Sequence, residues 1–349
     1  MAMNRYAIAT ACAMSVWVLG GFVGAPRAQQ PQPRASAPAV AAYTLVPSTY
    51  GQQLKTPDGR VVWDYLTRRP ESTPLTAPSA AFFHPVNTPT GEPVTAMAPN
   101  DHPHHRGIFF GWHDSEFHAP VDLSNYGPHK PIRALNITKA DFWAWGAFAT
   151  RDGRVIQNRD IKLTRADAAH AQVEIHNDWT VNNRKMVDEV NIVNVAEREG
   201  VYVLDFEYRI SPLVDYILNR ASFGGFDVQG RKDGESWFSD ATGKLVDRPD
   251  AYYSLPDLNW PDEPWYDFSL KATSTGKTFG FAVMNHPKNP PTTWHNSTHL
   301  WMLSPTINAG GQTTIGSGTT MTLRYRVVVH DGDTPTALLE KLATEWRAL

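Results

Sequence analysis

Two runs decide the fold of this chain: HAQVEIHNDWTV, residues 170–181, and KMVDEVNIVNV, residues 185–195. Polar and apolar residues alternate along both runs, which is the period of a β-strand with one buried face. The segment NNR, residues 182–184, lies between them and has the composition of a turn. The stretch therefore predicts an antiparallel hairpin.

Further strands are predicted on both sides of this hairpin. They cover VYVLDFEYRI (201–210), TFGFAVMNH (278–286) and TTMTLRYRVVVH (319–330), each preceded by a glycine-containing turn. Many short strands with few helical periods indicate a sandwich or a barrel. We predict an all-β fold, an antiparallel β-sandwich.

One helix is predicted, at the C-terminal end of the sequence. Thr334 is the expected cap and Pro335 the first helical residue. One face of this helix is apolar, and it carries Leu338, Leu339, Leu342, Trp346 and Leu349. We expect the helix to cover an edge or an open end of the sheet.

The first 28 residues have the pattern of a signal peptide. Arg5 precedes a long apolar stretch, and APRAQQ offers a processing site after Ala28. An uncleaved membrane anchor is the alternative. Residues 29–41, QQPQPRASAPAVA, read as a disordered linker. We therefore expect an exported protein, periplasmic or extracellular, with a single domain at residues 42–349.

Composition excludes several classes of function. Cys12, the single cysteine, lies in the apolar stretch, so the processed chain would have no disulfide, thiolate ligand or cysteine nucleophile. The net charge of −3 argues against a nucleic-acid surface. No later segment reaches the length of a membrane span. Nucleophile-elbow, phosphate-loop and dinucleotide motifs do not occur.

The segment DHPHHRG, residues 101–107, holds the densest group of chemically active side chains. If it were extended, His102, His104 and Arg106 would share one face. Pro103 prevents regular pairing, so we expect a loop that leads into the strand IFFGW, residues 108–112. That strand is apolar on both faces, which predicts a buried central strand with the histidines at the rim of the core.

Three interpretations of this segment stay open. His102 and His104 could chelate zinc, iron or manganese, although no third ligand is evident and no metal or other cofactor is predicted outright. His104 or His105 could act as general base or acid, with Arg106 lowering the histidine pKa and binding an oxyanion. The segment could also be structural, its side chains satisfying one another and the nearby backbone.

Other candidate residues are scattered along the chain. Glu189 is a candidate carboxylate partner and His286 a second acid–base group. Long aromatic and acidic loops such as residues 247–268 are typical of sugar sites, although they also pack on their own domain. The residues predicted to bind substrate are His84, His102, Arg231, Asn289, Trp260 and Trp265.

Taken in order, several of these segments resemble the PmoA-like domain family, whose members are largely exported. The segments are FFHPVNTPTG, DHPHHRGIFFGW, DFW, DWTVNNRKMVDEV, FGGFDVQGR, FGFAVMNHPKNP and LRYRVVVHDG, from about Ala80 to Asp331. Methane oxygenation is not implied, because that membrane enzyme needs several spanning helices. The resemblance implies an all-β fold of the galactose-mutarotase-like supersandwich kind, which binds sugars with histidines and carboxylates.

We therefore predict a carbohydrate-active enzyme that performs hydrolysis or elimination at a sugar ring. Hydrolysis needs two carboxyl groups, whereas elimination needs a base and a group that stabilises an anion. The sequence supplies histidine and arginine more clearly than a carboxyl pair, which favours elimination. The alternatives are a non-catalytic glycan-binding protein and a metal-dependent oxygenase. The sugar and the oligomeric state do not follow from the sequence.

Overall fold

The computed structural model describes residues 15, 20, 41–124, 127, 134–246 and 248–349. Apart from residues 15 and 20, the predicted signal peptide lies outside the described residues, and so does the predicted linker except residue 41. Residues Val40–Leu349 form one compact unit. Among the described residues, no helix is both long enough and apolar enough to cross a membrane.

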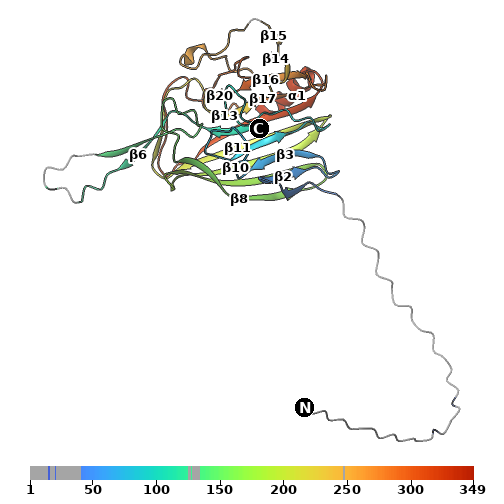
Figure 1. Ribbon diagram of the computed structural model, residues 1–349, viewed down its shortest axis with the longest axis horizontal. Coiled ribbons are helices and arrows are strands. Elements are labelled where there is room, and N and C mark those ends of the chain that lie inside the picture. The colour runs from blue at the N-terminus through green and yellow to red at the C-terminus, as the bar shows by residue number, and fades with distance from the viewer. Residues whose placement is uncertain (1–14, 16–19, 21–40, 125–126, 128–133, 247) are drawn as a thin grey trace, which may run out of the picture. The chain divides into compact units, whose positions relative to one another are not determined.

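Two antiparallel sheets form the sandwich (Figure 1). The seven-stranded sheet has the order β1 (Thr44–Pro47), β2 (Gly51–Lys55), β3 (Val61–Leu66), β4 (Phe82–Val86), β5 (Ile108–Gly111), β13 (Gly225–Gln229) and β19 (Met302–Leu303). The nine-stranded sheet has the order β15 (Gly243–Leu245), β14 (Gly234–Asp240), β16 (Tyr266–Ala272), β17 (Thr278–Asn285), β22 (Met321–Asp331), β11 (Val201–Pro212), β10 (Arg184–Arg198), β9 (His170–Val181) and β8 (Arg154–Ala166). The predicted all-β antiparallel sandwich is confirmed.

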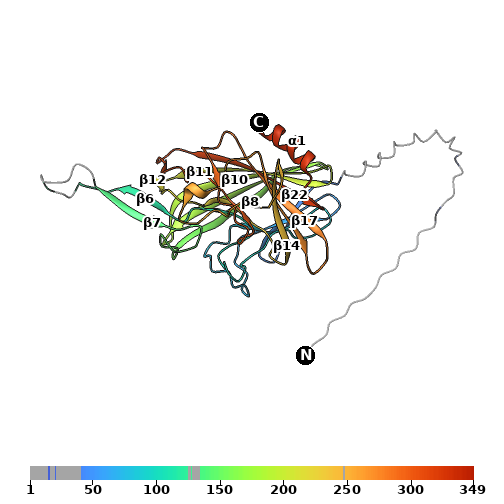
Figure 2. The same ribbon diagram turned by 90° about the horizontal axis from the view of Figure 1, so that it is seen from above.

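Two smaller sheets and two helical segments complete the described fold. A four-stranded sheet has the order β21 (Thr313–Ile315), β12 (Asp215–Leu218), β6 (Ser115–Pro120) and β7 (Leu135–Ala140), and β18 (Thr293–Trp294) pairs with β20 (Pro305–Thr306). The helical segments are the short 3₁₀ helix η1 (Pro256–Leu258) and the α-helix α1 (Thr336–Arg347). Both views show β6 and β7 projecting away from the sandwich (Figures 1 and 2).

The hairpin predicted from the opening stretch is β9 and β10. Val181 pairs with Arg184, and Asn182 and Asn183 both have positive φ, of 48° and 66°. Positive φ at both central residues is the geometry of a two-residue hairpin turn that matches the strand twist, and asparagine tolerates it. Buried and partly exposed residues then alternate along most of β10, so that every second side chain there enters the core.

The inward faces of the two sheets enclose the main hydrophobic core. Ile108 and Phe110 of β5 contribute to it from the seven-stranded sheet, and Phe206 and Tyr208 contribute from β11. Phe110 stacks on Tyr208 with ring centroids 4.3 Å apart. The predicted buried central strand is confirmed as β5, which ends at Gly111, one residue earlier than predicted.

The predicted C-terminal helix is α1, and it covers the outward face of the nine-stranded sheet. Figure 2 shows α1 on one side of that sheet and the N-terminal strands on the other. Leu339, Leu342 and Trp346 are buried against strands of the sheet. The capping detail was wrong: the helix begins at Thr336, and the Thr334 hydroxyl instead donates to Asp267. Leu349 is exposed and lies beyond the helix.

Candidate functional site

The segment 101–107 is folded into consecutive turns rather than extended. The backbone N–H of His102 donates to the carbonyl of Pro99, and that of His105 donates to the carbonyl of His102, both at 3.0 Å. The prediction that His102, His104 and Arg106 lie on one face of an extended chain was therefore wrong. Gly107 ends the segment with a φ of +54°, and a Cβ there would lie 2.0 Å from the Phe83 carbonyl oxygen. Glycine is needed because the backbone crosses β4 so closely.

Strand β5 separates this segment from the main core. Ile108 and Phe110 point into the core between the sheets. Phe109, on the opposite face, belongs to a second cluster that includes Trp143 and Phe223. The histidine rings lie with Phe109 and Trp143, so the candidate site is on the outward face of the seven-stranded sheet.

The histidines are buried under the segment that carries Trp143. His104 is 7% exposed and His105 is 0% exposed. The Trp143 ring centroid lies 5.0 Å from that of His104 and 4.9 Å from that of His105. The prediction that both histidines lie at the rim of the core was wrong, because the loop after β7 packs a large aromatic ring over them.

Arg106 holds two loops together. Its Nη1 donates to the carbonyl oxygens of His104 and Trp143, both at 3.0 Å, and its Nη2 donates to that of Phe142 at 3.3 Å. The guanidinium is fully buried and stacks over the Phe109 ring at 4.4 Å. Burial lowers the pKa of Arg106 to about 10. The predicted role in binding a substrate oxyanion was wrong, since these donors are turned to the backbone.

The hydrogen bonds of His105 fix its tautomer. The Gln229 amide nitrogen donates to the carbonyl oxygen of Leu300 at 2.7 Å, so the amide oxygen must accept from His105 Nδ1 at 2.6 Å. The proton is therefore on Nδ1, and Nε2 carries the lone pair. Burial keeps the pKa of His105 well below its ordinary value. Its Nε2 has no partner.

His104 is likewise a neutral imidazole. Burial first, and then the charges of His102, Arg106 and Arg151, lower its pKa to about 3. Its Nε2 is buried without a hydrogen-bond partner. A neutral ring among cationic groups can accept a proton once an anion enters and offsets their charge.

A carboxyl group lies on the same face of the sheet. Asp227 of β13 pairs with Phe109 of β5 and accepts a hydrogen bond from Trp143 Nε1 at 2.8 Å. Burial raises the pKa of Asp227 to about 7. Its second oxygen, Oδ1, has no partner. Asp227 and Trp143 were not predicted as site residues, although both lie in segments that carried the family resemblance, FGGFDVQGR and DFW.

A second group of rings adjoins Trp143. His113 stacks on Phe223 at 4.0 Å, and burial lowers the pKa of His113 to about 3. Phe148 lies 5.5 Å from His113 and is 46% exposed. Trp145 contacts Phe148 and Tyr253. These rings form an aromatic rim of Trp145, Phe148 and Tyr253 beside the buried imidazoles.

A cavity of about 400 Å³ opens next to this rim. It is lined by Lys139 and by the loop from Gly146 to Asp152. The Arg151 side chain in this loop is 38% exposed. The charge of this partly exposed guanidinium contributes to the lowered pKa of His104. Arg151 was not predicted as a site residue, because it stands alone in the sequence between a turn and a strand.

Glu189 is not part of this site. It points into the core between the sheets, where Asn177 Nδ2 donates to one carboxyl oxygen at 2.8 Å and Trp179 Nε1 to the other at 2.5 Å. Burial raises the pKa of Glu189 to about 7. Because strand β5 lies between Glu189 and the histidines, the predicted pairing of Glu189 with His104 or His105 was wrong.

His286 and Asn289 lie on yet another face. His286 contacts Trp346 of α1, on the outward side of the nine-stranded sheet. Asn289 bonds to the backbone of Arg324 through both its oxygen and its nitrogen, at 2.8 and 2.7 Å. The Asn289 amide is therefore engaged with the backbone of the neighbouring strand, away from the histidine segment.

His84 and Arg231 are nearer the candidate site, but no hydrogen bond joins them to the histidine segment. His84 Nδ1 bonds to the Thr95 hydroxyl at 3.0 Å, and burial lowers the pKa of His84 to about 4. Arg231 pairs with Asp233 and stacks over Phe279. Both side chains are engaged within the protein.

The two predicted tryptophan platforms are structural. Trp260 is buried and donates to the carbonyl of Pro249 at 2.7 Å. Trp265 is buried beneath α1 and donates to Glu340 at 2.7 Å. Neither ring can stack on a sugar, so this prediction was wrong.

The described residues contain no group of three or more histidine, cysteine, aspartate or glutamate side chains arranged to hold a metal ion. His102 and His104 have ring centroids 5.8 Å apart, and His102 Nδ1 lies 3.3 Å from Asp101. The proposed chelate of His102 and His104 therefore has no third ligand among these residues.

Comparison with solved structures gives remote likenesses. The chain is similar to a galactose mutarotase related enzyme from Lactobacillus acidophilus, with 8% identity over 82% of this chain and 97% of that chain and a TM-score of 0.35. It is also similar to a galactose mutarotase-like protein from Lactobacillus casei, with 9% identity over 82% of this chain and 100% of that chain and a TM-score of 0.34. No curated protein sequence matches the chain.

A family model does match, over residues 55–344. It describes a family of unknown function and not the PmoA-like family that the order of segments resembled, so that prediction was wrong. The match spans the histidine segment, Trp143, Asp227 and most of α1. The chain belongs to this family of unknown function, DUF6807.

Proposed function

We propose that the protein is a carbohydrate-active enzyme that eliminates across a bond of an acidic sugar. One observation carries the proposal: His104 is a neutral imidazole with an unpartnered Nε2, and the exposed guanidinium of Arg151 lies close enough to depress its pKa. Elimination next to a carboxylate needs such a base and such a cation. The cavity of about 400 Å³ beside Arg151 offers room for a sugar ring.

In this proposal the sugar carboxylate binds to Arg151 and its negative charge raises the pKa of His104. His104 then takes the proton from the ring carbon that bears the carboxylate. The electron pair of that C–H bond forms a C=C bond, and the glycosidic oxygen on the next carbon leaves with its electron pair. His102, whose side chain is partly exposed next to Asp101, donates the proton that the leaving oxygen needs.

The buried residues act as positioning residues. Arg106 fastens the His104 loop to the Trp143 loop, and Asp227 orients the Trp143 ring through its indole N–H. His105 lies edge-on to His104 with ring centroids 4.7 Å apart and is held by Gln229. Supporting groups that fix an acid–base residue in this way keep its geometry within the range that catalysis needs.

Hydrolysis with two carboxyl groups is less well supported. On this face Asp101 lies beside His102 and pairs with Lys232, and the described carboxyl groups near Arg106 are Asp227 and Asp141. The oxygens of Asp141 accept hydrogen bonds from the backbone N–H groups of Ala144 and Gly146. A flanking pair of free carboxyl groups, which glycosidases require, is therefore not available from these two residues.

The test is an assay of the purified protein against a panel of polyuronates and neutral glycans. Elimination creates a C=C bond conjugated to the carboxylate, which is followed by its ultraviolet absorbance. We expect acidic glycans to give this signal. His104→Gln should lower the rate about a hundredfold or more, the usual loss for a general base, and Arg151→Lys should lower it too. His176→Gln, on the opposite sheet, is the matched control and should keep full activity.

Other outcomes would reject the proposal. New reducing ends without absorbance would establish hydrolysis instead. Binding without any product would establish a glycan-binding protein, for which the aromatic rim of Trp145, Phe148 and Tyr253 supplies the stacking surface.

We also propose that the protein acts after export, in the periplasm or outside the cell. The charged start, apolar stretch and Pro-rich sequel of residues 1–41 support this. N-terminal sequencing of the exported protein should find a start near Gln29, and a start at Met1 with membrane retention would contradict it.

A further inference from the structure

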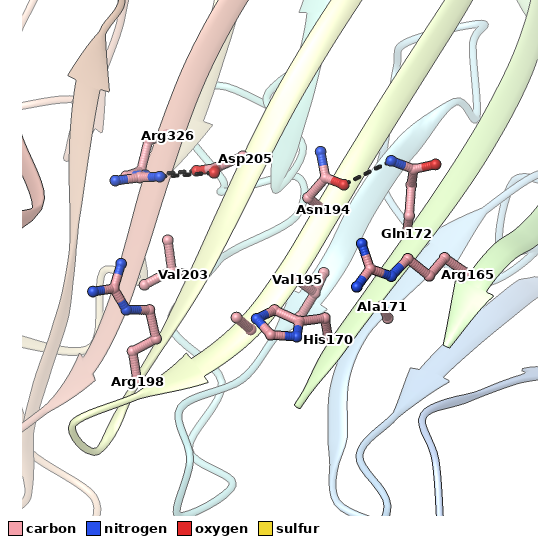
Figure 3. A pocket seen from close by; sticks show the side chains of 11 residues that line it. Arg165, His170, Ala171, Gln172, Asn194, Val195, Arg198, Val203, Asp205 and Arg326 are labelled. Carbon is pink, nitrogen blue, oxygen red and sulfur yellow. Dashed lines mark hydrogen bonds and ion pairs between the residues drawn. The ribbon is translucent and has the colours of Figure 1, made fainter. Parts of the chain in front are cut away.

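A row of polar side chains crosses the outward face of the nine-stranded sheet. The strand register aligns Arg165 of β8 with Gln172 of β9, Gln172 with Asn194 of β10, Asn194 with Asp205 of β11, and Asp205 with Arg326 of β22. Figure 3 shows these five side chains rising from adjacent strands, with His170 and Arg198 facing them. Outward faces of sheets are commonly polar, but an aligned row over five strands is a surface that can follow an extended ligand.

Two cavities lie along this row. One, of about 240 Å³, is lined by Arg165, His170 and Arg198 among others. The second, of about 220 Å³, is lined by His286 and Trp346 and shares Asn194 and Asp205 with the first. The two cavities therefore adjoin at Asn194 and Asp205, and Trp346 of α1 lines the second. We call the two cavities together the outer groove.

Cationic side chains outnumber carboxylates over the outer groove as a whole, although in the second cavity Lys288 and Arg324 lie with Glu207 and the shared Asp205. Arg165, Arg198 and Arg326 line the first cavity, against one carboxylate, Asp205. Arg326 makes two hydrogen bonds to Asp205, and Arg198 makes two to Glu345 of α1. The Arg165 side chain is 68% exposed and its nearest carboxylate, Asp167, lies at 3.6 Å. Arg165 is therefore the guanidinium most available to a ligand.

The polar groups of the groove present donors. Asn194 Oδ1 accepts from Gln172 Nε2 at 2.9 Å, which leaves the Asn194 amide N–H₂ to donate outward. His286 Nδ1 accepts from the backbone N–H of Lys288 at 3.0 Å, so its proton is on Nε2. This Nε2–H is buried and has no acceptor. A buried donor without a partner calls for an acceptor atom from a bound molecule.

We infer that the outer groove binds an acidic saccharide. The carboxylate of such a ligand would pair with Arg165, and its hydroxyl and ring oxygens would accept from Asn194 and His286. A ligand longer than a single anion is favoured because the donors are distributed over two adjoining cavities. This site is separate from the histidine segment, which lies on the outward face of the other sheet, and it does not depend on the chemistry proposed there.

The experiment measures binding of an acidic oligosaccharide by calorimetry in the full chain carrying Arg151→Ala, which removes the contribution of the first site. We expect binding that Arg165→Ala and Asn194→Ala each weaken by about tenfold or more, since each removes a hydrogen-bonding partner of the ligand. Lys162→Ala is the matched control: it is an exposed cation on β8 that lines neither cavity, and it should bind like the parent.

Three results would overturn the inference. Affinity that is unchanged in both variants would place the ligand elsewhere. Equal affinity for a neutral oligosaccharide of the same length would remove the role of Arg165. Displacement of the saccharide by inorganic phosphate at equal concentration would reduce the groove to a general oxyanion site. None of these results depends on turnover, so a failure of the elimination assay leaves this test intact.

Discussion

Arg106 shows how one residue type can serve two purposes. An arginine among histidines suggests a clamp for a substrate oxyanion, and its guanidinium has the right donors for that. In the structure those donors bind the carbonyl oxygens of His104, Phe142 and Trp143. The sequence could not distinguish the two roles, because Phe142 and Trp143 lie more than thirty residues away. The Arg106 guanidinium closes a loop, and our proposal therefore assigns the substrate carboxylate to Arg151 instead.

Arg106→Lys should therefore act on stability. The three donors of a lysine ammonium sit on one nitrogen and cannot reproduce the two nitrogens with which Arg106 reaches three carbonyl groups. Each buried group left unpaired costs roughly 1–3 kcal/mol. We expect the free energy of unfolding to fall by at least about 2 kcal/mol in denaturant titrations. Arg151→Lys, the same change at a partly exposed site, should leave it nearly unchanged. Equal stability of the two variants would show that Arg106 does not fasten the loops.

At the scale of elements, sequence periodicity predicted the strands and turns whose conformation depends on neighbouring residues. The alternation in residues 170–195 gave β9, β10 and their asparagine turn, because strand period and turn chemistry are local properties. The segment 101–107 departed from its predicted extended form, since its backbone pairs with itself in turns. The helix was predicted, but not its cap, because the Thr334 hydroxyl finds a distant partner in Asp267.

Strand β5 offers a direct test of this architecture. Phe110 is buried and packs against Tyr208, Trp112 and Trp179 from the core side of the strand. Phe110→Ala should lower the free energy of unfolding by roughly 3–5 kcal/mol, the range for large-to-small changes in a core. Phe148→Ala, at an exposed position of the aromatic rim, is the control and should change it little. A melting temperature unaffected by Phe110→Ala would mean that β5 is misplaced.

At the scale of the whole domain, the sandwich sorts the candidate residues into three regions. His104 lies on the outward face of one sheet, Glu189 between the sheets, and His286 on the outward face of the other. The order of residues in the sequence does not show which of these three regions a side chain enters, because the regions form only when strands from distant segments pair. Asp227 shows the same point: it joins the histidines only because β13 pairs with β5.

The buried ionisable groups of the domain shape the pH dependence of its stability in opposite directions. Burial raises the pKa of the carboxyl groups of Asp227 and Glu189 to about 7. A raised carboxyl pKa means that the folded state holds a proton that the unfolded state has released. Its stabilising effect is present below the unfolded pKa and is lost as pH rises through about 7. The buried histidines, with lowered pKa values, act the opposite way: they cost stability as pH falls below about 6.5.

The substitution Asp227→Asn isolates the contribution of the Asp227 carboxyl group to the pH dependence of stability. Asparagine keeps an oxygen that can accept from Trp143 Nε1 but has no proton to release. Between about pH 4 and 7 the Asp227 carboxyl group is ionised in the unfolded wild-type protein but still protonated in the folded one, so the free energy of unfolding falls as pH rises. The variant should therefore gain stability relative to wild type over this range, by at most roughly 4 kcal/mol for a pKa difference of about three units. Denaturant titrations of both proteins at several pH values give the difference directly. Asp152→Asn, at an exposed carboxylate, is the control and should give no such trend. Parallel curves for wild type and Asp227→Asn would show that the Asp227 carboxyl group is already ionised in the folded protein near neutral pH.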